Sequence, residues 1–274
     1  MSMTKRGLAA FVLCVLAAVW APGLLGQFAA DELAQRERWE DFLKTAAITG
    51  EKQIVGPMAV TSPWRLTLAK DGVTNDAVWK DIEGRVRGYV EGWKYEIAAY
   101  LLDTALGLNM VPPTVERRFH ERPGSCQIWV PDCISLKQRE EQKIKMPSYK
   151  VFGWNRATYL QRFWDNLIAN EDRHQNQILI TKDWRMILID HSRSFRTWKK
   201  LIYTERHPEG PKLMSELPRS IVERIKGLTF DGIKGLVGEN LSDDEIRTML
   251  VRRDLILAEM DRLIKKYGEA QVLY

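Results

Sequence analysis

The stretch YLQRFWDNLIANEDRHQNQILITKDWRMILIDHSRSF, from Tyr159 to Phe195, decides the fold of this chain. Apolar residues recur at helical spacing through 157–169, which predicts an amphipathic helix packed on a core. Two short apolar runs follow, Ile178–Ile180 and Met186–Ile189, and the polar turn between them predicts a hairpin. We therefore expect a helix, a polar loop and a hairpin in immediate succession.

Two aspartates stand at the ends of these predicted elements. Asp172 lies in the polar loop after the helix, and Asp190 follows the second strand of the hairpin eighteen positions later. The helix and the hairpin would deliver both carboxylates to the same end of the structure. Such a pair suits phosphoryl transfer, because one carboxylate can accept the proton of an attacking hydroxyl while the other holds the divalent metal.

The residues around these aspartates resemble a known family. Asp172-Arg173-His174, followed after the hairpin by Ile189-Asp190-His191-Ser192, is similar to the catalytic and metal-binding loops of the phosphatidylinositol 3- and 4-kinase-like branch of the protein-kinase fold. That branch has bacterial members and is related to the HipA kinases and the Golgi casein kinases. The resemblance implies ATP as phosphoryl donor, Mg²⁺ or Mn²⁺ as cofactor, Asp172 as the catalytic aspartate and Asp190 as a metal ligand.

The chain departs from this family at one metal-binding position. The family usually carries asparagine five residues after the catalytic aspartate, whereas this chain has Gln177 there and Asn176 one place earlier. The Golgi casein kinases have glutamate at this position, and an amide oxygen can also bind a hard cation. Gln177 and Asn176 are therefore both candidate metal ligands. Because of this departure, a kinase-like protein without catalytic activity is an alternative interpretation of the sequence.

The first half of the chain supplies the candidate nucleotide-binding residues. Alternating apolar residues predict strands at 64–68 and 78–82, and Lys80 shares a face with its apolar neighbours. A helix is expected over 93–107, with Glu96 in its first turn. By the resemblance, Lys80 contacts the phosphates of ATP, and Glu96 pairs with that lysine or helps to hold metal. The alternatives are an edge-strand lysine that points to water and a glutamate that only favours the helix dipole.

The remaining segments follow the order of a two-lobed kinase. Residues 114–130 predict a hairpin with its turn at Pro123-Gly124, and the resemblance places the adenine-binding hinge at Trp129–Asp132. Residues 134–150 are polar and charged, so we expect a mobile surface segment between the lobes. From Pro218 onward the apolar pattern is helical.

The amino-terminal residues have a different composition. Lys5 and Arg6 precede an uncharged run from Gly7 to Ala30, which is typical of an export signal. A cleaved signal peptide fits because Pro22-Gly23 interrupts the run, and an uncleaved anchor fits because the run exceeds the ~20 residues that span a bilayer. We expect an exported domain in the periplasm, the extracellular space or the secretory lumen, with any membrane contact made through residues 7–30.

Composition excludes several other classes of protein. The 274 residues carry a formal net charge of +5 and 28% charged side chains, which is an ordinary globular balance. Because the basic residues are scattered, no nucleic-acid partner is expected. The four histidines lack the spacing of zinc ligands. Cys126 and Cys133 can form a disulfide in an oxidising compartment or remain free buried thiols.

These observations together predict an α+β, two-lobed protein-kinase-like domain over residues 31–270, behind a signal peptide or anchor at 1–30. The small β-rich lobe covers about 48–130 and the helical lobe about 135–270. The expected activity is an ATP-dependent phosphotransferase of the phosphatidylinositol 3/4-kinase-like type, whose acceptor hydroxyl belongs to a protein, a lipid head group or a small molecule. The alternatives are a catalytically inactive kinase-like binding module and an exported adaptor that docks acidic partners.

Overall fold

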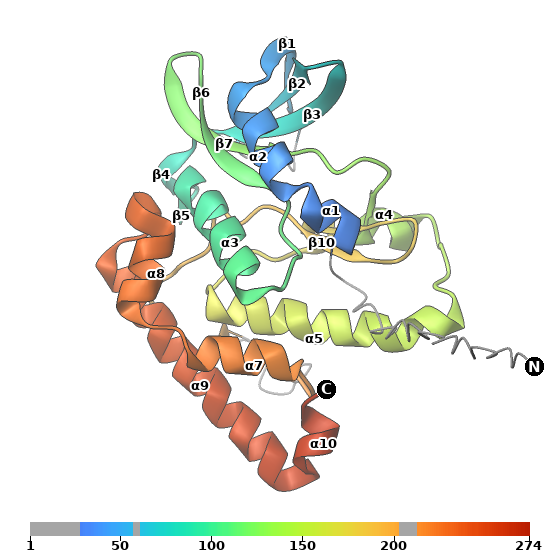
Figure 1. Ribbon diagram of the computed structural model, residues 1–274, viewed down its shortest axis with the longest axis vertical. Coiled ribbons are helices and arrows are strands. Elements are labelled where there is room, and N and C mark those ends of the chain that lie inside the picture. Colours follow the sequence, from blue (N-terminus) through green and yellow to red (C-terminus); the bar gives the residue numbers. More distant parts are fainter. Residues whose placement is uncertain (1–27, 57–60, 203–212) are drawn as a thin grey trace, which may run out of the picture.

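The computed structural model describes residues 28–56, 61–202 and 213–274. The expected export signal therefore lies almost wholly outside the described residues. Within them, no helix combines the length and the apolar character needed to cross a membrane. The chain forms a small lobe built on a sheet and a larger lobe built on helices, and Figure 1 shows the two stacked along the long axis of the molecule.

The small lobe is a five-stranded antiparallel sheet in the order β1-β2-β3-β7-β6. Its strands are β1 (Ala47–Gln53), β2 (Trp64–Lys70), β3 (Val73–Lys80), β6 (Thr114–Phe119) and β7 (Arg122–Ile128). The alternation in β2 buries Leu66 and Leu68 against Phe42 and Leu43 of a covering helix. The residues before the sheet form two consecutive helices, α1 (Ala30–Ala34) and α2 (Arg36–Thr45), and the covering helix is α2.

The turn between β6 and β7 differs from the prediction. The strands reverse at His120 and Glu121, whose φ angles are 47° and 63°, and Pro123-Gly124 lies within β7. A Cβ atom on Gly124 would lie 2.4 Å from the backbone oxygen of Lys80. The glycine therefore permits β7 to approach β3 closely, which is a tertiary requirement rather than a turn signal.

A short hairpin follows the sheet strand that carries Lys80, and no sequence pattern had predicted it. Its strands are β4 (Glu83–Val86) and β5 (Tyr89–Gly92), joined by a turn at Arg87-Gly88 with φ angles of 47° and 88°. Positive φ at both central residues is the conformation that tight hairpins use. The hairpin leads directly into α3 (Trp93–Leu106), which ends at Gly107 with φ of 68°, as predicted.

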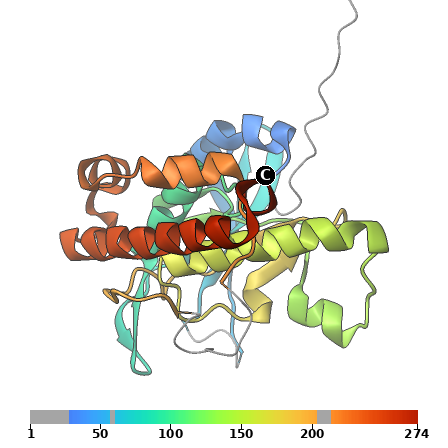
Figure 2. The ribbon, with the colours of Figure 1, turned by 90° about the horizontal axis from the view of Figure 1, so that it is seen from below.

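The large lobe is organised around α5 (Val151–Leu167), which Figures 1 and 2 show running beneath the sheet and beside α9. The predicted helix is confirmed, although it begins six residues earlier than expected. The predicted hairpin is confirmed as β9 (Ile178–Ile180) and β10 (Met186–Leu188). The helical end is also confirmed: it consists of α7 (Arg219–Lys226), α8 (Phe230–Val237), α9 (Asp243–Tyr267) and α10 (Glu269–Val272).

The segment between the lobes contains more regular structure than expected. β8 (Ile134–Ser135) pairs with β9, and α4 (Leu136–Glu141) starts where the Ser135 hydroxyl accepts a hydrogen bond from the Gln138 N–H at 3.1 Å. The expectation of a mobile segment over 134–150 was therefore wrong for its first half. The polar residues that suggested mobility instead form an exposed helix with a capped amino terminus.

The two cysteines of the described residues are free thiols. Burial raises the pKa of the Cys126 thiol to about 12 and that of Cys133 to about 11. Both side chains are therefore protonated at neutral pH. Of the two alternatives for this pair, the structure shows unbonded thiols.

Candidate active site

Lys80 lies at the end of β3, and its ammonium group faces two carboxylates. Lys80 Nζ is 2.6 Å from Glu96 Oε1 and 2.7 Å from Asp190 Oδ1. Glu96 belongs to α3, and Asp190 follows β10, so segments more than ninety residues apart in sequence meet here. The alternative of a lysine that points to water is wrong, because the Lys80 side chain is only 12% exposed.

The three groups stabilise one another in their charged forms. Burial alone would lower the pKa of Lys80, but the charges of Asp190 and Glu96 outweigh burial and hold it above its ordinary value. Burial likewise favours neutral carboxyls, yet the Lys80 charge holds the pKa values of Asp190 and Glu96 below their usual range. At neutral pH the cluster therefore carries two negative charges and one positive charge, which suits a bound cation.

Glu96 also fixes the backbone beyond Asp190. Its Oε2 accepts a hydrogen bond from the His191 N–H at 2.9 Å. Asp190 itself has a left-handed φ of 60°, which turns its carboxylate towards Lys80. The His191 ring is buried, and burial lowers its pKa, so the ring is neutral. Glu96 thus holds both Lys80 and the segment that presents Asp190.

Asp172 lies in the loop after α5, with its carboxylate partly exposed. Its backbone N–H donates to Asn170 Oδ1 at 3.1 Å. The neighbouring Arg173 points into the protein, where it pairs with Asp165 at 3.0 Å and donates to the backbone oxygen of Ile189 at 2.6 Å. Arg173 therefore braces the loop, and Asp172 is left facing outward.

Two residues beside Asp172 were missed by sequence reasoning. Arg193 Nη1 lies 3.1 Å from Asp172 Oδ2, and Arg193 Nη2 lies 2.7 Å from Glu91 Oε1. Glu91 is a buried residue of β5, and its other oxygen accepts from the Ser192 hydroxyl at 2.9 Å. The Arg87-Gly88 dipeptide is a turn signal that could have located the hairpin. No local pattern could have paired Glu91 with Arg193.

The structure distinguishes between the two candidate amide ligands. Gln177 Nε2 lies 3.2 Å from Asp190 Oδ2, whereas Asn176 Oδ1 faces the Ser135 hydroxyl at 3.5 Å. Only Gln177 of these two therefore contacts Asp190, and a half-turn of its amide would direct its oxygen to the same place. Among the described residues, no group of three His, Cys, Asp or Glu side chains could hold a metal ion. Asp190 and Gln177 fit Mg²⁺, which usually takes few protein ligands and completes its shell with phosphate oxygens and water.

A cavity of about 400 Å³ lies between the hinge and the large lobe. It is lined by Val78, Gln127, Ile128, Trp129, Val130, Asp132, Cys133, Ser135, Gln138, Asn176, Leu179 and Ile189. The lining includes Trp129, Val130 and Asp132 of the predicted hinge, and Ile189 joins it to Asp190. Apolar walls beside an extended backbone suit a flat heterocyclic base.

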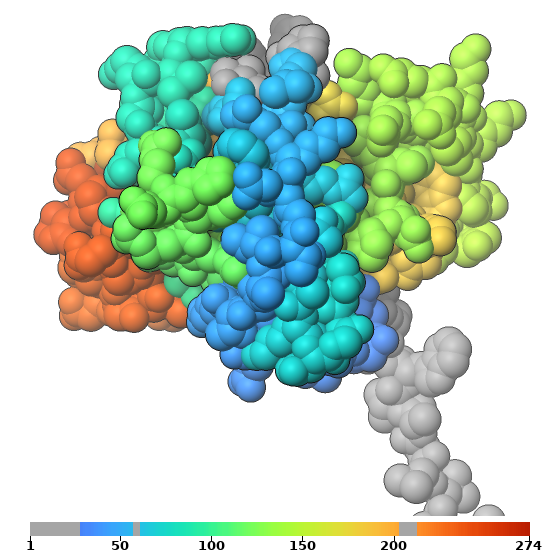
Figure 3. All heavy atoms as spheres, turned by 90° about the horizontal axis from the view of Figure 1, so that it is seen from above, coloured from blue at the N-terminus to red at the C-terminus, as the bar shows by residue number. Residues whose placement is uncertain are grey.

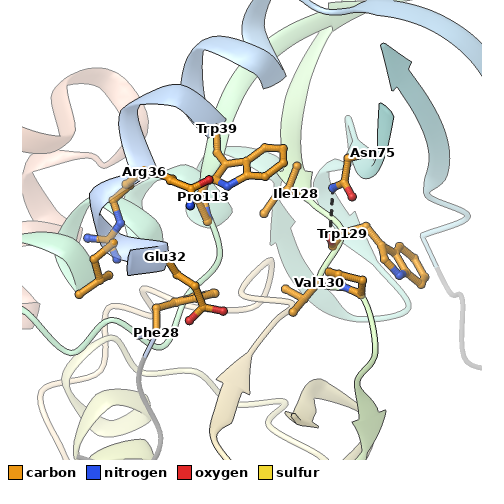
Figure 4. Close-up of a pocket in the computed structure, with 12 residues that line it drawn as sticks. Phe28, Glu32, Arg36, Trp39, Asn75, Pro113, Ile128, Trp129 and Val130 are labelled. Atoms are coloured by element: carbon orange, nitrogen blue, oxygen red, sulfur yellow. Dashed lines mark hydrogen bonds between the residues drawn. The ribbon is translucent and has the colours of Figure 1, made fainter. Parts of the chain in front are cut away.

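A second cavity, of about 250 Å³, lies where α1 and α2 meet the hinge. Figure 4 shows Trp39 above Ile128 and Val130, with Asn75 donating to the Trp129 backbone oxygen at 3.3 Å. Its lining shares the hinge residues Trp129 and Val130 with the first cavity, but it includes neither Asn176 nor Ile189, the neighbour of Asp190. The cavity between hinge and large lobe is therefore the better candidate for the nucleotide.

Comparison with known proteins resolves the fold. No family model and no curated protein sequence matches this chain. Two crystal structures of the Golgi casein kinase, the second with Mn/ADP bound, superpose with TM-scores of 0.63 at 17% identity. The superpositions cover 91% of this chain and 79% and 80% of the casein kinase chains. The chain has a protein-kinase-like fold.

The kinase-like α+β fold is thereby confirmed. The narrower assignment to the phosphatidylinositol 3/4-kinase-like branch stays a prediction, as do the roles of the individual site residues. Within the kinase-like fold, Lys80, Glu96 and Asp190 form one cluster. Asp172 lies outside it and is linked to it through residues 192 and 193.

Proposed function

We propose that this protein is an ATP-dependent phosphotransferase that transfers the γ-phosphoryl group to a hydroxyl. The observation that carries the proposal is the cluster of Lys80, Glu96 and Asp190 beside the hinge cavity. An apolar slot, an ammonium group and a carboxylate follow one another in the order in which ATP presents its base, its phosphates and its bound metal. The Mn/ADP complex of the Golgi casein kinase supports the choice of nucleotide and cation.

Each residue has a separate role in this proposal. The hinge cavity holds the adenine, Lys80 contacts the phosphates, and Glu96 keeps Lys80 extended. Asp190 and Gln177 would hold Mg²⁺ or Mn²⁺, which neutralises charge on the phosphates. Asp172 orients the acceptor hydroxyl and accepts its proton as the new oxygen–phosphorus bond forms and the bond to the β-phosphate oxygen breaks, releasing ADP.

The sequence order around Asp172 and Asp190 favours the lipid-kinase-like branch for this activity. The acceptor class remains a protein, a lipid head group or a small molecule, since acceptor loops carry no transferable pattern. We further propose that the domain acts after export, because an uncharged run of the export-signal type precedes it.

One observation favours a second candidate function. Gln177 supplies a neutral amide beside Asp190, where the Golgi casein kinases have glutamate, and its nitrogen faces the Asp190 carboxylate. A site with one negative charge fewer binds a divalent cation less tightly. The second candidate is therefore a kinase-like module that binds nucleotide without turnover.

A thermal-unfolding titration of the full chain with ATP tests the proposal. ATP with Mg²⁺ or Mn²⁺ at about one hundred times its dissociation constant should stabilise the protein by about 2.7 kcal/mol. Asp190→Ala should abolish the metal-dependent part of this shift. The surface variant Asp254→Ala, also a carboxylate loss, should retain it.

Turnover then separates the two candidates. Formation of ADP by the wild-type chain, lost in Asp172→Asn while the ATP-induced shift is kept, would establish the phosphotransferase. A metal-dependent shift without ADP formation would assign the binding module. Absence of any shift with ATP and either cation would exclude both.

A further inference from the structure

The linker between α4 and α5 begins a long basic stretch without acidic residues. From Gln142 to Trp164 there is no aspartate or glutamate, and there are five basic residues: Lys143, Lys145, Lys150, Arg156 and Arg162. This charge equals the +5 net charge of the whole protein, so all other residues together balance to zero. The linker and the start of α5 therefore form a basic part of the chain.

Large apolar side chains are exposed in the same linker. Tyr149 is 78% exposed, Phe152 63%, Val151 44% and Ile144 38%. No other nine consecutive residues of the described chain expose four large apolar side chains. Isolated exposed apolar residues are ordinary on protein surfaces, but a group of them marks a contact surface.

The apolar and basic side chains of this linker are interleaved. Lys150 lies over the Tyr149 ring, with its ammonium 5.7 Å from the centroid, and Arg156 lies over the Phe152 ring at 4.4 Å. Tyr149, Phe152 and Arg156 are spaced at three and four residues, so they share one side of the helix start. Arg156 also pairs with Glu216 at 2.9 Å, so the cations that this surface presents without an acidic partner among the described residues are its lysines.

The acidic residues that precede the linker do not neutralise it. Glu140 accepts a hydrogen bond from Gln175 at 2.8 Å, and Glu141 pairs with Lys137 at 3.8 Å. Within the described ranges, Lys143, Lys145 and Lys150 take part in no ion pair. Their charges are available to an external partner.

The linker also has the shape to meet a broad surface. Figure 2 shows the segment between α4 and α5 projecting from one edge of the molecule, and Figure 3 shows the same edge beside the sheet lobe and extending beyond it. A projecting edge can contact an extended plane without a clash from the rest of the protein. A convex surface of this kind differs from the grooves that bind peptides.

We propose that the linker from Lys143 to Phe152 docks on the surface of an anionic lipid bilayer. Each lysine near such a surface raises the affinity for the membrane by a factor on the order of five, through attraction to the anionic head groups. Tyrosine and phenylalanine rings occupy the boundary between head groups and acyl chains. If the uncharged run from Gly7 to Ala30 is kept as an uncleaved anchor, it would also bring the domain beside a bilayer.

Amide hydrogen exchange of the full chain, resolved by peptide, tests this docking separately from any contact through residues 7–30. Vesicles of phosphatidylcholine with phosphatidylserine should slow exchange at least threefold in peptides that cover 143–152. Vesicles of phosphatidylcholine alone should leave these peptides unchanged. Peptides around Leu255 and Tyr267, which are also exposed apolar residues, serve as internal controls.

Two sets of variants separate charge from apolar contact. The triple substitution Lys143→Glu, Lys145→Glu and Lys150→Glu should abolish the slowing. A matched triple substitution of surface lysines elsewhere, Lys226→Glu, Lys265→Glu and Lys266→Glu, should retain it. Tyr149→Ser with Phe152→Ser should reduce it even though every lysine is kept. Because all these positions are on the surface, thermal unfolding should show each variant to be folded.

Two outcomes would overturn the proposal. One is unchanged exchange at 143–152 while the chain co-sediments with anionic vesicles, which would assign membrane contact to other residues. The other is equal slowing by soluble polyglutamate without lipid, which would assign the linker to an acidic protein partner. Neither outcome depends on whether the protein is a phosphotransferase.

Discussion

Arg193 connects Asp172 of the large lobe with Glu91 of the small lobe. Its Nη1 lies 3.1 Å from Asp172 Oδ2, and its Nη2 lies 2.7 Å from Glu91 Oε1. The guanidinium also lies over the Tyr89 ring, 4.4 Å from its centroid. Glu91 is buried, and its carboxylate takes its hydrogen bonds from Arg193 and the Ser192 hydroxyl. The position of the proposed catalytic carboxylate therefore depends on how the β4–β5 hairpin packs against the large lobe.

Glu91→Gln should slow turnover without weakening nucleotide binding. The neutral amide holds Arg193 less firmly, so the Asp172 carboxylate is less well placed for the acceptor hydroxyl. A misplacement of this kind lowers kcat by roughly ten- to a hundredfold. Steady-state formation of ADP gives kcat, and the ATP-induced thermal shift should match that of the wild type.

Arg87→Lys provides the control on the same hairpin, because Arg87 is exposed at the turn. It should leave both kcat and the thermal shift unchanged. A rise in the KM for ATP in Glu91→Gln, with kcat preserved, would contradict the positioning role. Such a result would mean that the hairpin acts on the nucleotide instead.

Lys80→Met should destabilise the protein far more than Lys70→Met. Lys80 neutralises two carboxylates in a buried cluster, and removing one partner of a buried pair costs about 3–5 kcal/mol. Lys70 pairs with Asp41 at the surface, where a pair contributes about 1 kcal/mol or less. Urea unfolding at pH 7 measures both losses, and equal losses would contradict the account of the cluster.

The same variant should have an altered dependence on pH. In the wild type, the depressed pKa values of Glu96 and Asp190 contribute stability that is present above their unfolded pKa and is lost as pH falls. Without Lys80, the two carboxyls favour protonation in the folded state. The stability deficit of Lys80→Met should therefore shrink as the pH is lowered towards 4.

The local elements of this fold could be predicted from the sequence. The helix and hairpin within 159–195 have their own apolar periods, so Asp172 and Asp190 could be placed at their ends. The Lys80–Glu96 pair followed from order along the chain together with the resemblance. These features depend on short segments, each of which contains its own signal.

Features that depend on tertiary contacts could not be predicted. Gly124 was interpreted as a turn residue, yet it is a glycine because β3 passes too close for a side chain. The hydrogen bonds from Arg193 to Glu91 span 102 positions in the sequence. Helix α4 lacks an apolar face and starts at the Ser135 cap instead. In each case the cause lies in a neighbour that local periodicity does not reveal.

Asp103 should make the protein less stable as pH rises from 4 to 7. Its carboxyl on α3 is fully buried, and burial raises its pKa to about 7, although the Met110 N–H donates to it at 2.9 Å. A carboxyl whose pKa is higher in the folded protein than in the unfolded chain stabilises the folded state fully at pH values below its pKa in the unfolded chain. This stabilisation is lost as pH rises through about 7. The free energy of unfolding should fall by about 1.4 kcal/mol per pH unit from this group.

Asp103→Asn should remove this part of the pH dependence, because the amide can accept the Met110 hydrogen bond without titrating. The informative quantity is the slope of unfolding free energy between pH 5 and pH 7, whatever the absolute stability of the variant. Asp254→Asn on the exposed side of α9 should leave the slope as in the wild type. Identical slopes in all three proteins would show that Asp103 is ionised in the folded state.

Arg252 holds the segment after Ser192 onto the helical core. It is a fully buried residue of α9, and its guanidinium donates to the backbone oxygens of Leu167, Arg196 and Trp198 at 3.0, 2.7 and 2.8 Å. Arg252→Met fills similar space but leaves these oxygens without a donor. Each unsatisfied oxygen should lower the free energy of unfolding by about 1–3 kcal/mol. We expect the free energy of unfolding, measured with urea, to be lower by about 3 kcal/mol or more in this variant.

Arg262→Met provides the matched control on the same helix, because Arg262 is exposed and pairs only with Glu259 within the described residues. It should change stability by less than about 0.5 kcal/mol. If Arg252→Met is as stable as Arg262→Met, water must replace the guanidinium at the three oxygens. Faster amide exchange at 194–200 in Arg252→Met, with exchange at α7 unchanged, would locate the loss in the segment that follows Asp190.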